Sequence, residues 1–329
     1  MRIAVDGYGG DHSPSEVVKG VLAALAEDEN IEILLTGRSE ELAALAGEHD
    51  RLTIRDARDV ISCDEAPTVA IRTKKDSSLV VALDAVREGE ADGLVSAGST
   101  GAVLIGATLK IGRVRGVERP ALAPALPTIK GGTVILCDCG ANVDCRPSYL
   151  VGFARMASVY ARGVFGVDRP RVGLLNNGAE ETKGNAFSLE CHALLKAAEG
   201  IDFIGNVEAR DILSGEVDVV VADGFDGNVA LKSAEGTANA VFSLLKQGIT
   251  SGGLRAKLGA LMLKPVFKGL KRTLDYNEHG GAAFLGLKKP VVKAHGSSMA
   301  KSICGAILQV RDMILGETSE RLARDLSNE

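Results

Sequence analysis

Turns rich in glycine, with serine, threonine, asparagine, lysine or histidine among them, recur along this sequence of 329 residues. Glycine lets the backbone approach a ligand closely, and the free N–H groups at a helix start favour an anion. Side-chain donors such as Ser99, Thr100 and Asn142, with the charge of Lys183, suit a phosphate group. The turns lie at residues 6–14, 96–101, 138–142, 176–185, 223–228 and 295–298. Together they predict a site for a phosphate-sized anion.

Short apolar runs precede these turns, and amphipathic stretches of helical length separate the runs. Several runs are continuously apolar, which is typical of strands buried on both faces of a parallel sheet. Their alternation with helices predicts an α/β fold with a doubly wound sheet, formed by a single domain over residues 1–329. Expected strands are 3–6, 31–36, 52–55, 92–96, 121–126, 133–138, 171–176, 217–222, 283–285 and 291–294. Expected helices are 15–27, 77–88, 99–110, 147–163, 185–199, 228–247 and 298–315.

In doubly wound sheets, ligands bind beyond the carboxyl ends of the strands. All six turns follow expected strands, so we expect them to share one site at that edge. The first turn also carries a helix-start signal, because Ser13 can cap a helix with Glu16 three residues later. The alternative is that Gly, Ser, Asn and Asp serve only as turn and cap residues, which for any one turn is the commoner case.

Several known signatures are missing from the sequence. It has no GxxxxGK[ST] P-loop, and residues 7–12 are not GxGxxG because His12 occupies the last glycine position. It also has no GxSxG nucleophile elbow. Cys139 lies in one of the turns and could form a thioester, but nothing in the sequence identifies a base for it. A P-loop nucleotidase, a dinucleotide enzyme and a serine hydrolase are therefore all disfavoured.

Composition narrows the class of protein further. Charged residues make up 25% of the chain and the formal net charge is -5, so neither disorder nor nucleic-acid binding is expected. No signal peptide follows Met1, and no apolar run approaches the roughly 18 residues that span a bilayer, which predicts a cytoplasmic protein. The six cysteines include no CxxC pair and are expected to be reduced core residues rather than metal ligands.

In their order and spacing the turns resemble those of the bacterial phosphate acyltransferases of phospholipid synthesis. The matching stretches run from residue 6 to 298. Departures are Gly7 and Tyr8 where the family commonly has Ala-Met, Cys139 where an aliphatic residue is usual, and His279 where Tyr is frequent. The matches are residues 9–14, 74–78, 96–102, 138–142, 175–178, 183–184, 223–228, 280–282 and 295–298.

The resemblance implies transfer of a long-chain fatty acyl group from acyl carrier protein to inorganic phosphate, giving acyl phosphate. It also implies a Rossmann-like, three-layer αβα fold with a mostly parallel sheet, related to phosphotransacetylases and isocitrate-dehydrogenase-like enzymes. A homodimer is implied as well, with no metal and no organic cofactor.

That reaction asks for positioning more than for proton transfer, because phosphate is already a nucleophile and a thioester is already activated. We expect Ser99, Thr100, Asn142 and Lys183 to bind the phosphate. Asn185 is expected to orient Lys183 or to contact the phosphate itself.

The remaining candidates would act on the thioester. Asn228 is a candidate for stabilising the oxyanion together with backbone N–H groups, and Asp223 is expected to orient Asn228 or Lys183. His12 and His295 are candidates for protonating the leaving thiolate or for binding phosphate. A histidine in a glycine turn is more often structural, and that alternative stays open for both.

A basic stretch without any Asp or Glu extends over residues 236–274. Leu254, Leu258 and Leu261 follow helical spacing, and Pro265 is expected to break the helix. The flanking lysines include Lys257, Lys264 and Lys268. The pattern predicts a protruding pair of amphipathic helices that contacts an anionic membrane surface or acyl carrier protein. The alternative is an apolar face that packs on the domain or on a second subunit.

Three other functions remain open. A phosphotransacetylase-like enzyme would use acyl-CoA with nearly the same chemistry. A nicotinamide-dependent dehydrogenase on the related fold would need a dinucleotide fingerprint that the sequence lacks. A regulator that binds phosphate or lipid would keep the basic helices but show no turnover.

Overall fold

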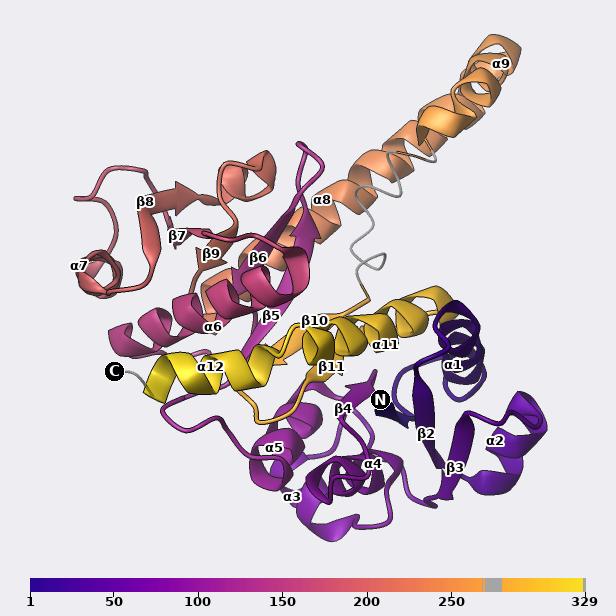
Figure 1. Ribbon diagram of the computed structural model, residues 1–329. Helices are drawn as coiled ribbons and strands as arrows, with labels where there is room; N and C mark the ends of the chain where they lie inside the picture. Colours follow the sequence, from indigo (N-terminus) through magenta and orange to yellow (C-terminus); the bar gives the residue numbers. More distant parts are fainter. Residues whose placement is uncertain (268, 270–279, 328–329) are drawn as a thin grey trace.

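The computed structural model describes residues 1–267, 269 and 280–327, and within them 11 strands form one sheet (Figure 1). The strands are β1 (Arg2–Asp6), β2 (Glu32–Gly37), β3 (Leu52–Asp56), β4 (Gly93–Ser96), β5 (Ala121–Pro127), β6 (Thr133–Cys137), β7 (Arg171–Asn176), β8 (Asp202–Glu208), β9 (Val219–Val221), β10 (Ala282–Leu285) and β11 (Val291–Lys293). Their order across the sheet is β3-β2-β1-β4-β11-β10-β5-β6-β9-β7-β8.

Helices cover both faces of this sheet, as the three-layer αβα prediction requires. They are α1 (Ser15–Glu27), α2 (Ser39–Ala46), α3 (Pro67–Thr73), α4 (Ser78–Arg87), α5 (Thr100–Lys110), α6 (Pro147–Phe165), α7 (Ala186–Ala197), α8 (Gly224–Ser251), α9 (Gly253–Met262), α11 (Ala300–Leu315) and α12 (Thr318–Ser327). A 3₁₀ helix, η1, spans Ala209–Ser214.

The direction of the strands reverses in the middle of the sheet. Strand β5 pairs antiparallel with β6, and β10 pairs antiparallel with both β5 and β11, whereas every other pair is parallel. As a result β6, β7, β8 and β9 run opposite to β1, β2, β3, β4 and β11. Their carboxyl ends therefore lie at opposite edges of the sheet. The expectation that all six turns share one edge is wrong.

Side chains of each strand alternate between two packed cores. In β1, Ile3 and Val5 join the core beneath α1, α6 and α11, whereas Ala4 faces the core beneath α3, α4 and α5. Farther along the sheet, this second face is covered by α8, whose Leu231 packs on a smaller core around β6 and β9. One face thus has a continuous helical layer, and the other has two separate groups of helices.

The doubly wound fold is confirmed, and all of the expected strands and helices are present with small shifts at their ends. Strand β8 and helices α2, α3 and α12 were not expected. The predicted cap of the first helix is wrong: the Ser13 hydroxyl donates to the carbonyl oxygen of Gly10 at 2.8 Å and makes no capping bond. Glu16 instead accepts a hydrogen bond from the backbone N–H of Ala300.

Helices α8 and α9 project away from the rest of the molecule (Figure 1). Helix α8 is 28 residues long and extends beyond the expected 228–247 by four residues at each end; it starts earlier because Asp223 caps it, accepting bonds from the N–H groups of Phe225 and Asp226. Helix α9 ends at Met262, shortly before Pro265, as the proline predicts.

Candidate active site

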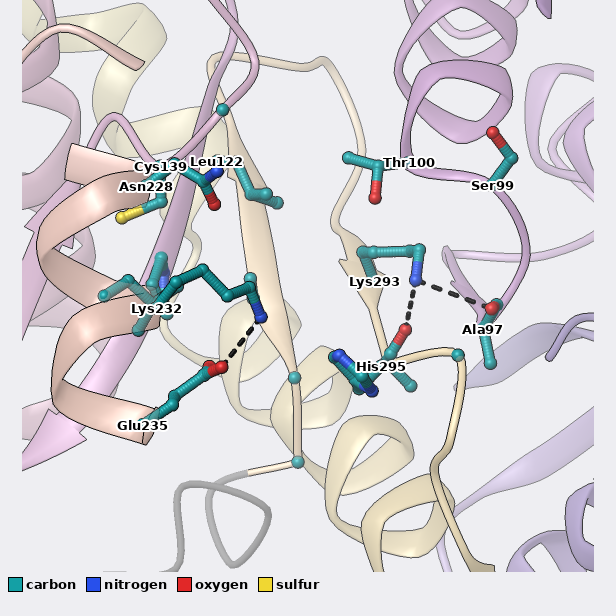
Figure 2. Close-up of a pocket in the computed structure, with 18 of the residues that line it drawn as sticks. Ala97, Ser99, Thr100, Leu122, Cys139, Asn228, Lys232, Glu235, Lys293 and His295 are labelled. Carbon is teal, nitrogen blue, oxygen red and sulfur yellow. Dashed lines mark hydrogen bonds and ion pairs between the residues drawn. The ribbon is translucent and has the colours of Figure 1, made fainter. Parts of the chain in front are cut away.

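A central cavity of about 580 Å³ opens where the two groups of helices on the second face separate. The start of α5 and the turn after β11 form one side, and the first turns of α8 form the other (Figure 2). Four of the residues predicted for the site line it, namely Ser99, Thr100, Asn228 and His295. The structure thus brings together donors that are up to 196 residues apart, counted as 295 minus 99.

The turn that follows β4 is held by a chain of hydrogen bonds. Ser96 Oγ donates to the buried Asp6 carboxylate at 2.7 Å and accepts from the backbone N–H of Gly98 at 3.0 Å. Gly9 packs so closely that a Cβ there would lie 2.6 Å from the Gly98 nitrogen. The turn leads into α5 with Ser99 as the cap residue, and the Ser99 hydroxyl makes no capping bond. This leaves the Ser99 hydroxyl and the first N–H groups of α5 available to an anion.

His295 presents a defined ring nitrogen to the cavity. The backbone N–H of Ser297 donates to His295 Nδ1 at 3.2 Å, and the Ser297 hydroxyl lies 2.8 Å from the same atom. Because Nδ1 accepts, a neutral imidazole carries its proton on Nε2. Burial, with Lys232 and Lys293 nearby, lowers the pKa of His295 below its ordinary value. His295 is therefore suited to donate from Nε2 as a neutral ring.

Helix α8 contributes one stripe of polar residues to the cavity. Asn228, Lys232 and Glu235 follow one another at helical spacing and all line it. Lys232 Nζ pairs with Glu235 Oε2 at 2.7 Å, and this pair faces the opposite wall (Figure 2). Lys232 and Glu235 were not predicted from the sequence, although their spacing of four and seven residues from Asn228 was a usable signal.

Lys293, at the end of β11, is a second cation that the sequence analysis missed. Its side chain lines the cavity although only 9% of the residue is exposed. Lys293 Nζ donates to the carbonyl oxygen of Ala97 at 3.5 Å and to that of Ala294 (Figure 2). Burial lowers the pKa of Lys293 to about 8. A lysine at the end of an otherwise apolar strand, directly before the His-Gly turn, was the signal in the sequence.

The floor of the cavity is apolar. Leu122, Pro124 and Leu126 of β5 line it together with Leu231 of α8. Cys139 also lines it but is buried, and burial raises the pKa of its thiol well above the ordinary value. A thiol held in the protonated form is a poor nucleophile. The floor therefore suits an acyl chain better than covalent catalysis.

Three predicted residues lie at the opposite edge of the sheet. Asp223 and Asn185 line a second cavity of about 880 Å³ on the other side of α8. Asn185 caps α7 in a capping box with Ser188, and Asp223 caps α8. Lys183 is exposed on the loop between β7 and α7 and lines neither cavity. Reversal of the strand direction is what separates these residues from Ser99 and His295.

Two further candidates also lie outside the central cavity. Asn142 Nδ2 donates to the carbonyl oxygen of Pro120 at 2.8 Å and to Asp138 Oδ2 at 3.0 Å, so its amide is engaged within its own turn. His12 is exposed in the first turn, next to Asp11, whose N–H donates to the carbonyl oxygen of Gly296 at 2.8 Å. Their roles in phosphate binding and proton transfer stay predictions.

The apolar stripe of α9 is open to solvent. Leu254, Leu258 and Leu261 are 75%, 54% and 65% exposed, so the alternative that this face packs on its own domain does not hold. Lys257 and Lys264 flank the stripe, and Lys268 lies outside the described residues. In the part of the chain that the structure describes, no helix is long and apolar enough to cross a membrane.

Cysteine and metal chemistry add little to the site. The cysteines are unpaired thiols, of which Cys137, Cys139, Cys191 and Cys304 are buried as expected, whereas Cys63 is exposed. Within residues 1–267, 269 and 280–327, no cluster of three His, Cys, Asp or Glu side chains could hold a metal ion.

Known proteins resemble this chain over nearly its whole length. The phosphate acyltransferase of Bacillus licheniformis is 49% identical over 314 residues, 95% of this chain and 94% of that protein. The phosphate acyltransferase of Geobacillus thermodenitrificans is 49% identical over 326 residues, 99% of each chain.

Solved structures share the fold at low identity. A phosphotransacetylase from Streptococcus pyogenes matches with a TM-score of 0.63 at 19% identity, over 95% of this chain and 94% of that chain. A 4-hydroxythreonine-4-phosphate dehydrogenase from Klebsiella pneumoniae matches with a TM-score of 0.52 at 14% identity, over 96% and 99%. Both likenesses concern the fold alone.

The family described as fatty acid synthesis protein matches residues 1–321. With these relatives, the family match sets aside the dehydrogenase and regulator alternatives. The chain belongs to this family and is a phosphate acyltransferase of fatty acid and phospholipid synthesis.

Proposed function

We propose that the enzyme transfers a long-chain fatty acyl group from acyl carrier protein to inorganic phosphate in the central cavity. A phosphate oxygen forms a bond to the thioester carbonyl carbon, and the carbon–sulfur bond then breaks. The proton of hydrogen phosphate leaves with the thiolate, so acyl phosphate and a free thiol result. No oxidant, reductant or covalent acyl-enzyme is required.

The observation that carries this proposal is the contrast between the walls and the floor of the cavity. Ser99, Thr100 and His295 supply neutral donors beside the start of α5, where the helix dipole favours a dianion. Leu122 and Leu126 offer an apolar surface next to them. A polar nucleophile and an apolar acyl chain thus both find suitable surfaces within one cavity.

Asn228 faces the phosphate wall from α8 and is the proposed donor to the oxyanion that develops on the carbonyl. Removing one such donor typically lowers kcat by a factor of about 10²–10³. The neutral His295, with its proton on Nε2, is the proposed donor to the phosphate or to the leaving sulfur.

The carrier and the membrane are proposed to meet the protruding helices. The stretch 236–274 has no acidic residue, which complements the acidic surface expected of acyl carrier protein or of anionic lipid. The exposed leucines of α9 would enter the outer layer of a bilayer and place the enzyme peripherally on the cytoplasmic face. We further propose that two copies form a homodimer.

Turnover with two carriers tests this function. The enzyme is incubated with phosphate and either palmitoyl-acyl carrier protein or palmitoyl-CoA, and acyl phosphate is trapped with hydroxylamine as the hydroxamate. We expect phosphate-dependent hydroxamate with the carrier protein at a kcat/KM at least tenfold above that with CoA. Preference for CoA would favour the phosphotransacetylase-like alternative, and no product with either carrier would refute the proposal.

A further inference from the structure

Lys293 is a buried cation that has no carboxylate partner among the residues that the structure describes. Within the described residues it forms no ion pair within 4.0 Å, and its ammonium rests on the carbonyl oxygens of Ala97 and Ala294. The neighbouring Asp6 carboxylate is already engaged by Ser96 Oγ and by the backbone N–H of Tyr8. A buried charge is costly unless an opposite charge or strong acceptors compensate it. Two neutral carbonyls are weak compensation for a full positive charge.

The position of Lys293 is set by the sheet. Strand β11 pairs in parallel with β4, and Lys293 lies opposite Ser96, immediately before the turn that leads into α5. The ammonium therefore lies on the same side of the cavity as Thr100 and His295 (Figure 2). The other cation of the cavity, Lys232, is half-exposed and is paired with Glu235. Of these two lysines, Lys232 has its charge balanced by a carboxylate, whereas Lys293 has only carbonyl oxygens as acceptors among the described residues.

We propose that Lys293 is the cation that binds the substrate phosphate, by turning its ammonium from the Ala97 carbonyl to a phosphate oxygen. This inference rests on the proposed function and adds the residue that supplies charge at its nucleophile site. The phosphate brings the negative charge that the buried ammonium lacks. The α5 N–H groups and the His295 ring then hold the remaining oxygens.

The test compares wild type with Lys293→Met and Lys293→Arg, using initial rates over a range of phosphate concentrations. Methionine keeps similar bulk without charge, and arginine keeps the charge in another shape. We expect Lys293→Met to raise the KM for phosphate roughly tenfold to a hundredfold while the KM for the acyl carrier stays within about twofold. Lys288→Met, on the exposed turn between β10 and β11, is the matched control and should behave as wild type.

The pH profile separates a phosphate ligand from a merely structural lysine. With its pKa near 8, Lys293 loses its proton above that pH, so the phosphate KM of wild type should rise there. The groups that face it are Asp6, Asp11, Cys63, Lys232 and His295. Lys293→Met should lack this rise, because it has no ammonium to lose a proton. The titration of phosphate itself affects both proteins equally and cancels in the ratio of their phosphate KM values. Lys293→Arg should also lack it, because its charge persists.

Protein integrity is followed by thermal unfolding with and without phosphate. A ligand that binds only the folded state stabilises it by RT ln(1 + [L]/Kd), so at a phosphate concentration above the wild-type Kd and below that of the variant, phosphate should raise the Tm of wild type but not that of Lys293→Met. A folded Lys293→Met protein with the wild-type phosphate KM and the same rise above pH 8 would overturn the inference and leave the proposed function standing. Wild type without phosphate-dependent turnover would instead overturn the proposed function.

Discussion

The hydroxyl of Ser96 donates a 2.7 Å hydrogen bond to the carboxylate of Asp6, although the two residues are 90 positions apart. This bond joins the ends of the neighbouring parallel strands β1 and β4. Asp6 Oδ1 also accepts a hydrogen bond from the backbone N–H of Tyr8, and Ser96 Oγ in turn accepts one from the backbone N–H of Gly98. Asp6 thus braces the first turn and also the turn that leads into α5.

Replacing Asp6 should damage both stability and phosphate binding. Asp6→Ala leaves the buried Ser96 hydroxyl and the Tyr8 N–H without their acceptor, which should lower the free energy of unfolding by about 1–3 kcal/mol. The phosphate KM should rise with it, because the turn before Ser99 loses its brace. Asp92→Ala is the matched control, since Asp92 accepts from the N–H of Arg2 at the other end of β1. Equal phosphate KM values in the two variants would contradict the bracing role.

The lowered pKa of His295 predicts a pH-dependent contribution to stability. The folded protein resists protonating this ring, whereas in the unfolded chain it titrates near 6.5. Stability is therefore lost as pH falls from about 6.5 towards the folded pKa, and is fully present above 6.5. As pH falls below about 6.5, the free energy of unfolding of His295→Gln should decrease less than that of wild type. Urea unfolding at a series of pH values measures the difference. A pH dependence identical in both proteins would show that the ring is not held neutral.

Lys183 can be tested apart from the cavity, because it lies at the opposite edge of the sheet. The assignment of Lys183 as a phosphate ligand predicts that Lys183→Ala raises the phosphate KM roughly tenfold or more, whereas phosphate bound by Lys293 in the central cavity predicts a KM within about twofold of wild type. Lys196→Ala is a suitable control, since Lys196 pairs with Glu181 near the same loop. A wild-type phosphate KM in Lys183→Ala would remove this residue from the site and confine phosphate contacts to the central cavity.

The exposed leucines of α9 should govern attachment to anionic lipid. Leu258→Glu with Leu261→Glu replaces apolar contact area by charges that the lipid headgroups repel, so co-sedimentation with phosphatidylglycerol vesicles should fall at least tenfold. Activity with the acyl carrier measured without vesicles reports separately on carrier docking. Undiminished vesicle binding by a folded variant would reject the membrane role.

Local signals in the sequence were enough to place the elements and part of the site. The turns after β4 and β11 were identified correctly because glycines and short polar residues directly follow apolar strands. Asn228 was also found, and it lines the cavity from the first turns of α8, beside Gly140 of the turn after β6. The glycine-interrupted strand β8 was missed, since Gly205 breaks its apolar pattern.

The reversal of strand direction could have been predicted from the lengths of two connections between strands, although the similarity of the turns suggested a single direction. Only five residues, 128–132, connect β5 to β6, and another five, 286–290, connect β10 to β11. A parallel connection needs a crossover of a dozen or more residues, so both pairs had to be antiparallel. Lys293 was harder to find, because its burial depends on the packing of β11 between β4 and β10 rather than on neighbours in sequence.

The position of bound phosphate decides whether the central cavity is the site of the nucleophile. Crystals of the enzyme soaked in phosphate should show the anion in the central cavity, within hydrogen-bond distance of the α5 N–H groups, Thr100 and Lys293 Nζ. Phosphate at the end of β7 beside Lys183, with none in the central cavity, would refute phosphate binding by Lys293 and the start of α5.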